Sequence, residues 1–243
     1  MRDRVEKFLK DRVDSSWLEL LTNALLELDR DYLEFILNSK EYIPNSKNIF
    51  NAFKSLPKSK VKYILFGQDP YPREESAIGY AFIDGAVKSI FSKDGLSKEV
   101  NRATSLRNFI KMLLVNINRL NPHNTTKEAL KDIKKDDLID SIYDLKSNFE
   151  KSGVLLLNVA LLFTSKDKSN YHIKQWRPFI KYLLNNLNPK IELILFGNHA
   201  KDIVDKLQPP QKYILIEHPY NVSFINSKEA YRVFGKMNLL FPH

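Results

Sequence analysis

The stretch VKYILFGQDPYPREESAIGYAF, at residues 61–82, contains the clearest strand signal of this chain. It begins with an apolar run over 61–66, whose valine, isoleucine, tyrosine and phenylalanine side chains favour a buried strand. The run stops at Gly67, and the residues QDPYP follow at 68–72. Two prolines around a tyrosine predict a stiff turn, because each fixes its own φ and restricts the residue before it. The stretch therefore predicts a strand that presents one carboxylate, Asp69, on a rigid turn.

Further apolar runs at 154–157, 191–196 and 213–216 predict three more buried strands, and helical patterns separate them. Helices are expected at 2–12, at 16–38 with a Ser16–Glu19 capping box, from a cap at Thr104 or Ser105 to about 120, and at 176–187. Two more are expected from His199 to Leu207 and at 227–240. This alternation predicts an α/β fold, a single domain with a central four-stranded parallel sheet flanked by helices on both faces. We expect one domain over 1–243, with a helical part at 1–60 and a sheet-bearing core at 61–243.

Composition narrows the class of function. The chain has no Cys, which excludes disulfides and thiolate catalysis, and its five His are scattered, so no metal site and no cofactor is expected. His123 and His243 are expected at the surface. The net charge of +9 favours a polyanionic partner such as nucleic acid. No apolar run reaches the roughly 18–20 residues of a membrane span, and the charged start is unlike a signal peptide, so we expect a cytoplasmic protein without membrane contact.

Polar side chains follow each predicted strand: Gln68 and Asp69, then Asn158, then Asn198 and His199, then His218. Ligands of an open parallel sheet bind outside the carboxyl ends of its strands. A carboxylate can stabilise a cation or activate water, an amide can recognise a pyrimidine edge, and an imidazole can donate to an oxyanion. Tyr71 and Phe82 supply aromatic faces near the first strand. Together with a basic surface, these side chains indicate a pocket for a flipped base. Each residue alone has an ordinary structural role, and only their joint occurrence favours a site.

The motifs GQDPYP, GYAF, LLLN and HPxxxS, in this order, resemble those of the family 1 uracil-DNA glycosylases, with TSLRN and FGNHA as further matches. The resemblance spans residues 61 to about 235. It implies hydrolysis of the N-glycosidic bond of uracil in DNA, as a step of base excision repair.

The resemblance also implies a role for each matching residue. Asp69 and His218 match the catalytic pair, the aspartate acting on water and the sugar and the histidine on uracil O2. The implied uracil-binding residues are Gln68 in the pocket wall, Tyr71 as the gate against a 5-methyl group, Phe82 as the stacking ring and Asn158 as the reader of the uracil edge. The implied DNA-binding residues are Ser105, Pro219, Val222 and Ser223.

The sequence departs from that family at several positions. Pro72 stands where the family has a histidine, Ile78 stands before the glycine of the next motif, and the late loop reads HPYNVSF. The segment YHIKQW is also shifted by one position. Either Val222 or Phe224 is expected to be the wedge that enters the DNA groove.

Two alternatives to this activity stay open from the sequence. A non-catalytic DNA-binding or processivity module could use the same fold, and a hydrolase of free nucleosides could use the same strand ends. For the main hypothesis the expected partner is uracil-containing DNA, single- or double-stranded, and the protein is expected to be a monomer. Proteinaceous glycosylase inhibitors that mimic DNA are a further expected partner.

Overall fold

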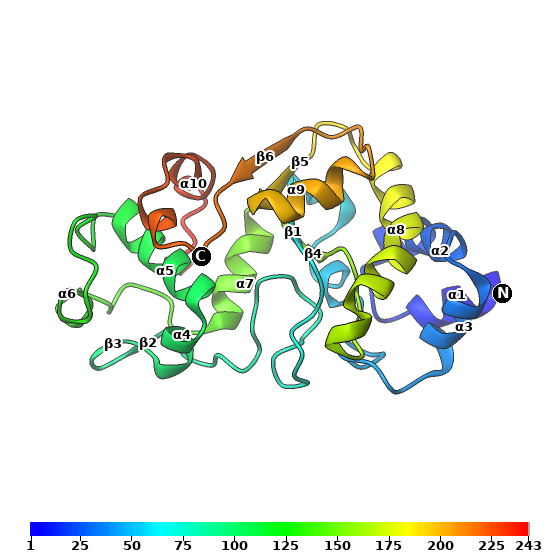
Figure 1. Cartoon of the computed structure of the whole chain (residues 1–243), viewed down its shortest axis with the longest axis horizontal. Coiled ribbons are helices and arrows are strands. Elements are labelled where there is room, and N and C mark those ends of the chain that lie inside the picture. Colours follow the sequence, from blue (N-terminus) through cyan, green and yellow to red (C-terminus); the bar gives the residue numbers. More distant parts are fainter. Residues whose placement is uncertain (243) are drawn as a thin grey trace. The chain divides into compact units, whose positions relative to one another are not determined.

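The computed structural model describes residues 1–242, and it contains a four-stranded sheet with the strand order β4-β1-β5-β6 (Figure 1). The strands are β1 (Tyr63–Gly67), β4 (Val154–Asn158), β5 (Glu192–Phe196) and β6 (Tyr213–Ile216). All four begin and end within two residues of the predicted runs. His243 lies outside the described residues.

The sheet register brings the central strand β1 against a parallel strand on each side. Tyr63 pairs with Val154 of β4 and with Glu192 of β5, and Gly67 pairs with Asn158. Ile64 and Leu65 point to opposite faces of the sheet, and both are at most 1% exposed. Such burial on both faces is typical of parallel sheets covered by helices. The predicted α/β fold, a four-stranded parallel sheet flanked by helices, is confirmed.

The chain forms two compact units, and each is described by itself. One comprises Met1–Asp84 and Gly153–Leu215, and the other comprises Gly85–Ser152 and Ile216–His243. The predicted boundary at residue 60 stays a prediction. The helices of the first unit are α1 (Arg2–Leu9), α2 (Leu18–Leu26), α3 (Arg30–Asn38), α8 (Ser169–Asn185) and α9 (Gly197–Asp205), with short 3₁₀ turns at Ser15–Trp17, Asn51–Phe53, Lys58–Lys60 and Lys166–Lys168.

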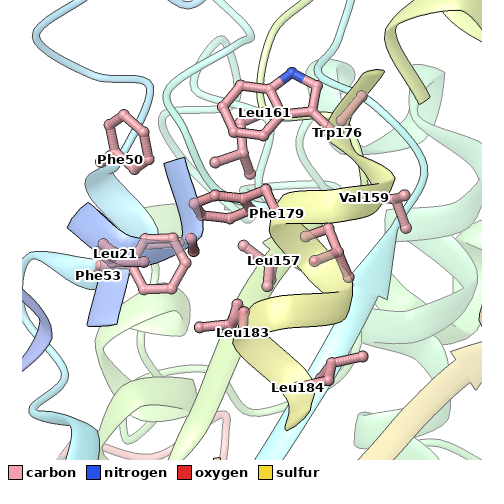
Figure 2. Close-up of a cluster of buried hydrophobic side chains, with 14 of the residues drawn as sticks. Leu21, Phe50, Phe53, Leu157, Val159, Leu161, Trp176, Phe179, Leu183 and Leu184 are labelled. Carbon is pink, nitrogen blue, oxygen red and sulfur yellow. The ribbon is translucent and has the colours of Figure 1, made fainter. Parts of the chain in front are cut away.

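Aromatic and leucine side chains form the core of the first unit. Figure 2 shows Trp176 and Phe179 of α8 between the end of β4 and the segment of Phe50 and Phe53. Trp176 and Phe179 meet edge to face at 5.0 Å, and both are fully buried. Each ring of this size removes a large apolar area from water, so this cluster anchors α8 on the sheet.

The first helices differ from the prediction. The expected single helix at 16–38 is wrong, because α2 ends at Leu26 and Asp29 then caps α3, accepting hydrogen bonds from the backbone N–H groups of Asp31 and Tyr32. The expected Ser16–Glu19 capping box is also wrong, since Asp14 is the residue that accepts from the N–H of Ser16.

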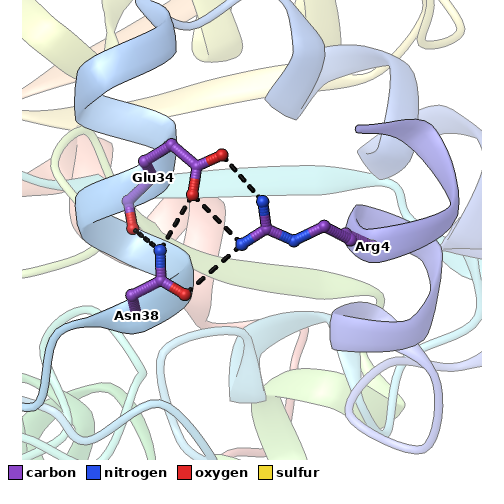
Figure 3. Close-up of polar contacts among 3 residues, drawn as sticks. All are labelled: Arg4, Glu34 and Asn38. Carbon is purple, nitrogen blue, oxygen red and sulfur yellow. Dashed lines mark hydrogen bonds and ion pairs between the residues drawn. The ribbon is translucent and has the colours of Figure 1, made fainter.

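A polar contact links the first and third helices. Figure 3 shows Arg4 of α1 donating to both carboxylate oxygens of Glu34 on α3, at 2.8 and 3.0 Å, and to Asn38 at 3.3 Å. Such a bidentate pair has a defined geometry, and it links the two helices at the surface.

The helix α8 begins seven residues before its predicted start at Trp176. Pro178 therefore lies inside the helix and not in its first turn. A proline removes one backbone donor, and the aromatic core around Trp176 and Phe179 compensates for the lost hydrogen bond. The last predicted helix, at 227–240, is shorter than expected and covers only α10 (Lys228–Phe234), with Ser227 as its cap.

The second unit is built around α5 (Thr104–Asn116), and its other elements are β2 (Phe91–Ser92), β3 (Gly95–Leu96), α4 (Lys98–Arg102), α6 (Lys127–Lys131), α7 (Ile142–Lys151), the 3₁₀ turn η5 (Val222–Asn226) and α10. The ring centroid of Phe109 in α5 lies 5.8 Å from that of Phe149 and 4.9 Å from that of Phe234. These three rings form the centre of the core of the second unit. The β2–β3 hairpin was not predicted, because each strand has only two residues. None of the helices within residues 1–242 is long and apolar enough to cross a membrane.

Candidate functional site

The loops that follow β1 and β4 run together beyond the end of the sheet. The N–H of Val159 donates to the carbonyl of Gly67 at 2.9 Å, and the N–H of Ala160 donates to the carbonyl of Gln68 at 3.0 Å. The two chains therefore stay paired for two residues past the strands. This pairing places Gln68, Asp69 and Asn158 at one edge of the sheet, as the parallel topology predicts.

Gly67 leaves the space that the Asn158 side chain fills. A Cβ at Gly67 would lie 2.1 Å from Oδ1 of Asn158 and 3.0 Å from the Cβ of Ala81. Asn158 is only 7% exposed, so its amide has little freedom to move elsewhere. The Asn158 amide can therefore take its observed position only because residue 67 is a glycine.

Asp69 is half-buried, and its carboxylate is held by a residue from another element. The hydroxyl of Ser169, the first residue of α8, donates a hydrogen bond to Oδ2 of Asp69. Burial raises the pKa of Asp69 above its usual value, whereas the Ser169 hydrogen bond and the charge of His199 on α9 act in the opposite direction. The carboxylate is therefore a desolvated base with a defined orientation.

Two aromatic residues lie beside this edge. The phenol of Tyr71 donates to the carbonyl of Phe82 at 3.3 Å, and burial raises the pKa of Tyr71. Phe82 has a left-handed backbone with φ of 68°, which is a strained conformation for a residue with a side chain. Its ring lies 5.8 Å from that of Phe196 at the end of β5. Backbone strain is often kept at functional sites, so the conformation of Phe82 supports a role for this residue in the site.

His218 belongs to the second unit and has a defined tautomer. Its Nδ1 accepts a hydrogen bond from the backbone N–H of Tyr220 at 3.0 Å. In the neutral ring the proton must then be on Nε2, which makes Nε2–H a hydrogen-bond donor. Desolvation of the ring lowers the pKa of His218, which favours this neutral form.

The loop after His218 is fixed by a buried amide. Asn108 of α5 is 1% exposed, and its Nδ2 donates to the carbonyl of Pro219 at 2.8 Å and to that of Asn221 at 3.3 Å. Glu217 accepts from Nδ2 of Asn221 at 3.0 Å and from the hydroxyl of Ser223 at 2.6 Å. The loop backbone is therefore organised before any ligand binds.

The two candidates for the groove wedge differ in exposure. Val222 is 69% exposed, whereas Phe224 is fully buried and lies 6.1 Å from the ring of Phe109. The alternative of Phe224 as the wedge is therefore wrong. Tyr220, at 66% exposure, is a second exposed apolar side chain on the same loop.

Ser105 lies in the first turn of α5 and is half-buried. The predicted cap at Thr104 or Ser105 is wrong, because the residue before the helix is Ala103 and no side chain caps it. Ser105 and the loop of Pro219, Val222 and Ser223 all belong to the second unit, whereas Gln68, Asp69, Tyr71, Phe82 and Asn158 belong to the first. Within residues 1–242, no group of three or more His, Cys, Asp or Glu side chains is placed to hold a metal ion.

Three residues with a defined part in these arrangements were not predicted, namely Ser169, Asn108 and Glu217. Ser169 is 100 residues from Asp69 in the chain. It also lies before the predicted helix start at Trp176, so the prediction gave it no place near the strand ends. Asn108 is the last residue of the motif TSLRN, so that motif was an available signal. No pattern in the sequence indicates the contacts of Glu217.

Comparisons with known proteins agree on one family. The profile described as the Uracil DNA glycosylase superfamily matches residues 53–240. The uracil-DNA glycosylase of Campylobacter fetus is 28% identical over 221 residues, which cover 86% of this chain and 81% of that protein.

Solved structures give the same result. The wild-type UNG of Nitratifractor salsuginis is 48% identical, with a TM-score of 0.95 over 99% of this chain and 98% of that one. A mimivirus UNG variant, solved in complex with UGI, is similar in fold alone, with 17% identity and a TM-score of 0.53 over 86% of this chain and 71% of that one.

Proposed function

The chain belongs to the uracil DNA glycosylase superfamily and excises uracil from DNA in repair, and from this premise we propose that Asp69 and His218 are its catalytic residues. The reaction hydrolyses the bond between C1′ of the deoxyribose and N1 of uracil. The electron pair of that bond goes to the base, and a water molecule supplies the new oxygen at C1′ and a proton. Positive charge therefore develops on the sugar and negative charge on uracil.

Asp69 acts on the sugar side of the reaction. An ionised carboxylate stabilises the developing cation and orients the attacking water. The observation that carries this assignment is the position of Asp69 at the carboxyl end of β1, half-buried and oriented by the hydroxyl of Ser169. Partial desolvation strengthens its interaction with a cation, because the effective dielectric constant is lower than in water.

His218 acts on the base side of the reaction. Its Nε2–H donates a hydrogen bond to uracil O2, where the negative charge collects. The hydrogen bond that Nδ1 accepts from Tyr220 supports this assignment, because it leaves Nε2 as the donor of the neutral ring. A neutral donor stabilises the uracil anion without requiring a proton from solution.

Four residues of the first unit recognise the base in this proposal. The amide of Asn158 reads the N3 and O4 edge of uracil, and Phe82 stacks on its face. Tyr71, held by its hydrogen bond to the carbonyl of Phe82, excludes the 5-methyl group of thymine. Gln68 forms the wall of the pocket, and its Nε2 donates to the hydroxyl of Ser169 at 3.3 Å.

DNA contacts come from the second unit. Ser105, Pro219 and Ser223 contact the phosphate backbone, and Val222 enters the groove as a wedge, for which its 69% exposure gives support. The net charge of +9 supplies attraction to the phosphates, with no preference for sequence. A single- or double-stranded DNA substrate, a monomeric state, a cytoplasmic location and binding by DNA-mimicking inhibitor proteins belong to the same proposal.

An Asp69→Asn variant tests the catalytic assignment. Uracil-containing DNA is incubated with each protein, and abasic sites are scored by alkaline cleavage. We expect the rate of base release to fall by several orders of magnitude, with DNA affinity little changed, because the neutral amide cannot stabilise the sugar cation. Asp94→Asn, at an exposed position in the β2–β3 turn, is the matched control. Near-normal turnover by Asp69→Asn would refute the role of Asp69.

A further inference from the structure

The hydroxyl of Ser169 joins two residues of the loop after β1. It donates to Oδ2 of Asp69, and it accepts a hydrogen bond from Nε2 of Gln68 at 3.3 Å. Ser169 and the loop are about a hundred positions apart in the sequence, so this contact depends on the fold and not on local geometry. The three side chains form one chain of hydrogen bonds that ends on the carboxylate.

The direction of this chain follows from the chemistry of its members. A serine hydroxyl has one proton to donate and two lone pairs to accept with. The Gln68 amide N–H can only donate, so it occupies a lone pair of the Ser169 oxygen and leaves the proton for Asp69. An ionised carboxylate can only accept, and hydrogen bonds to it are stronger than those between neutral groups. The arrangement is thus complementary to the ionised form of Asp69.

The position of Ser169 adds a second favourable interaction. Ser169 is the first residue of α8, a helix of 17 residues whose preceding residue, Lys168, makes no side-chain cap. The N–H of Ser169 itself donates to the carbonyl of Lys166 in the preceding 3₁₀ turn, and the N-terminal end of a helix carries a partial positive charge. A carboxylate held at this end by Ser169 therefore interacts favourably with the helix, again in its ionised form.

Orientation is the other consequence of the contact. Because Oδ2 is tied to Ser169, rotation of the carboxylate about its Cβ–Cγ bond would break a charged hydrogen bond. Oδ1 then keeps a defined direction as well. The proposed role requires this defined direction, because the carboxylate must orient the attacking water and face the developing sugar cation, and misplacement by about 1 Å can cost about a hundredfold in rate.

We propose that Ser169 is a positioning residue for the glycosylase reaction, which keeps the Asp69 carboxylate ionised and correctly oriented. This inference rests on the proposed catalytic role of Asp69. It assigns to Ser169, in the first turn of α8, a part in the reaction that it plays through Asp69. Gln68 then has a second role besides the pocket wall, because its amide directs the proton of Ser169 toward Asp69.

A Ser169→Ala variant tests this proposal, with rates measured on uracil-containing DNA across a range of pH. We expect kcat to fall roughly ten- to a hundredfold, the effect of a lost hydrogen bond to a charged group, with KM little changed. The decline of activity on acidification should begin at a higher pH than in the wild type, because the carboxylate loses a group that favours its ionised form. Ser169→Thr keeps the hydroxyl and should recover most of the activity.

Two further variants distinguish a positioning role from a general effect on the helix. Asn170→Ala changes the exposed neighbour of Ser169 in the same helix turn and should leave kcat and the pH profile as in the wild type. Ser169→Ala should have no further effect in an Asp69→Asn background. An unchanged pH profile and kcat in Ser169→Ala, with Asp69→Asn inactive, would overturn the positioning role alone. Near-normal activity of Asp69→Asn would instead overturn the proposed function on which it rests.

Discussion

Replacing Gly67 by alanine tests how the strand ends position the Asn158 amide, which we propose to recognise the base. Position 67 is the last residue of β1, and its partner across the ladder is Asn158. The added Cβ would lie 2.1 Å from Oδ1 of Asn158, whereas ordinary contacts begin at 3.4 Å. The Asn158 side chain must therefore rotate or shift by more than about 1 Å, because the backbone on both sides is held by the sheet.

The expected loss follows from this displacement. A reacting or recognising group that is misplaced by about 1 Å can cost about a hundredfold in rate, which corresponds to about 2.7 kcal/mol. Overpacking of a buried site also costs typically about 1–3 kcal/mol of stability. Gly67→Ala should therefore lower kcat/KM for uracil excision about a hundredfold and lower the melting temperature by several degrees.

The assay is uracil release from DNA at a temperature where circular dichroism shows that every variant is folded. A double-mutant cycle with Asn158→Ala isolates the mechanism, because that variant already lacks the amide. If the added methyl group acts through the Asn158 side chain, Gly67→Ala should cost much less in the Asn158→Ala background. Equal losses in both backgrounds would show that the methyl group does not act through Asn158, and wild-type activity of the folded single variant would show that the site tolerates it.

Three further outcomes are expected. Tyr71→Ala should release thymine from DNA, measured by chromatography of the free base, because it removes the ring that blocks the methyl group; continued rejection of thymine would place the gate elsewhere. Asn108→Ala should weaken DNA binding about tenfold or more in a filter-binding assay, because the buried carbonyl of Pro219 loses its donor and the loop its conformation; unchanged affinity would contradict this. Asp69→Asn should raise the melting temperature at neutral pH and not at acidic pH. Burial raises the pKa of Asp69 in the folded protein, so the wild type loses stability as the pH rises from the pKa of the unfolded chain to this higher value. A lower melting temperature of Asp69→Asn at neutral pH would contradict this expectation.

The strands could be predicted because each is a short apolar run with a sharp end. Burial on both faces requires continuous apolar residues, and Gly67 or Asn158 then marks the point where the sheet stops. The site edge followed from the same signal, since parallel strands bring their carboxyl ends together. Asp69 and Asn158 were therefore predicted as neighbours without knowledge of any contact.

Helix ends and long-range polar contacts could not be predicted in the same way. Asp29 divides an otherwise helical pattern, and only its hydrogen bonds to Asp31 and Tyr32 reveal the boundary. Pro178 indicated a helix start, whereas the buried aromatic core stabilises the helix on both sides of it. The contact of Ser169 with Asp69 depends on this longer helix, so the error in α8 also hid a residue of the site.

A conflict between burial and charge explains why the surroundings of Asp69 are arranged as they are. Desolvation makes a carboxylate more effective against a cation, but it also favours the protonated form, which cannot play the role proposed for Asp69. A fully exposed Asp69 would stay ionised and would interact weakly. Burial without these partners would raise the pKa of Asp69 further and favour its protonated form. The hydroxyl of Ser169 and the charge of His199 oppose the effect of burial, so the carboxylate can be both partly desolvated and ionised.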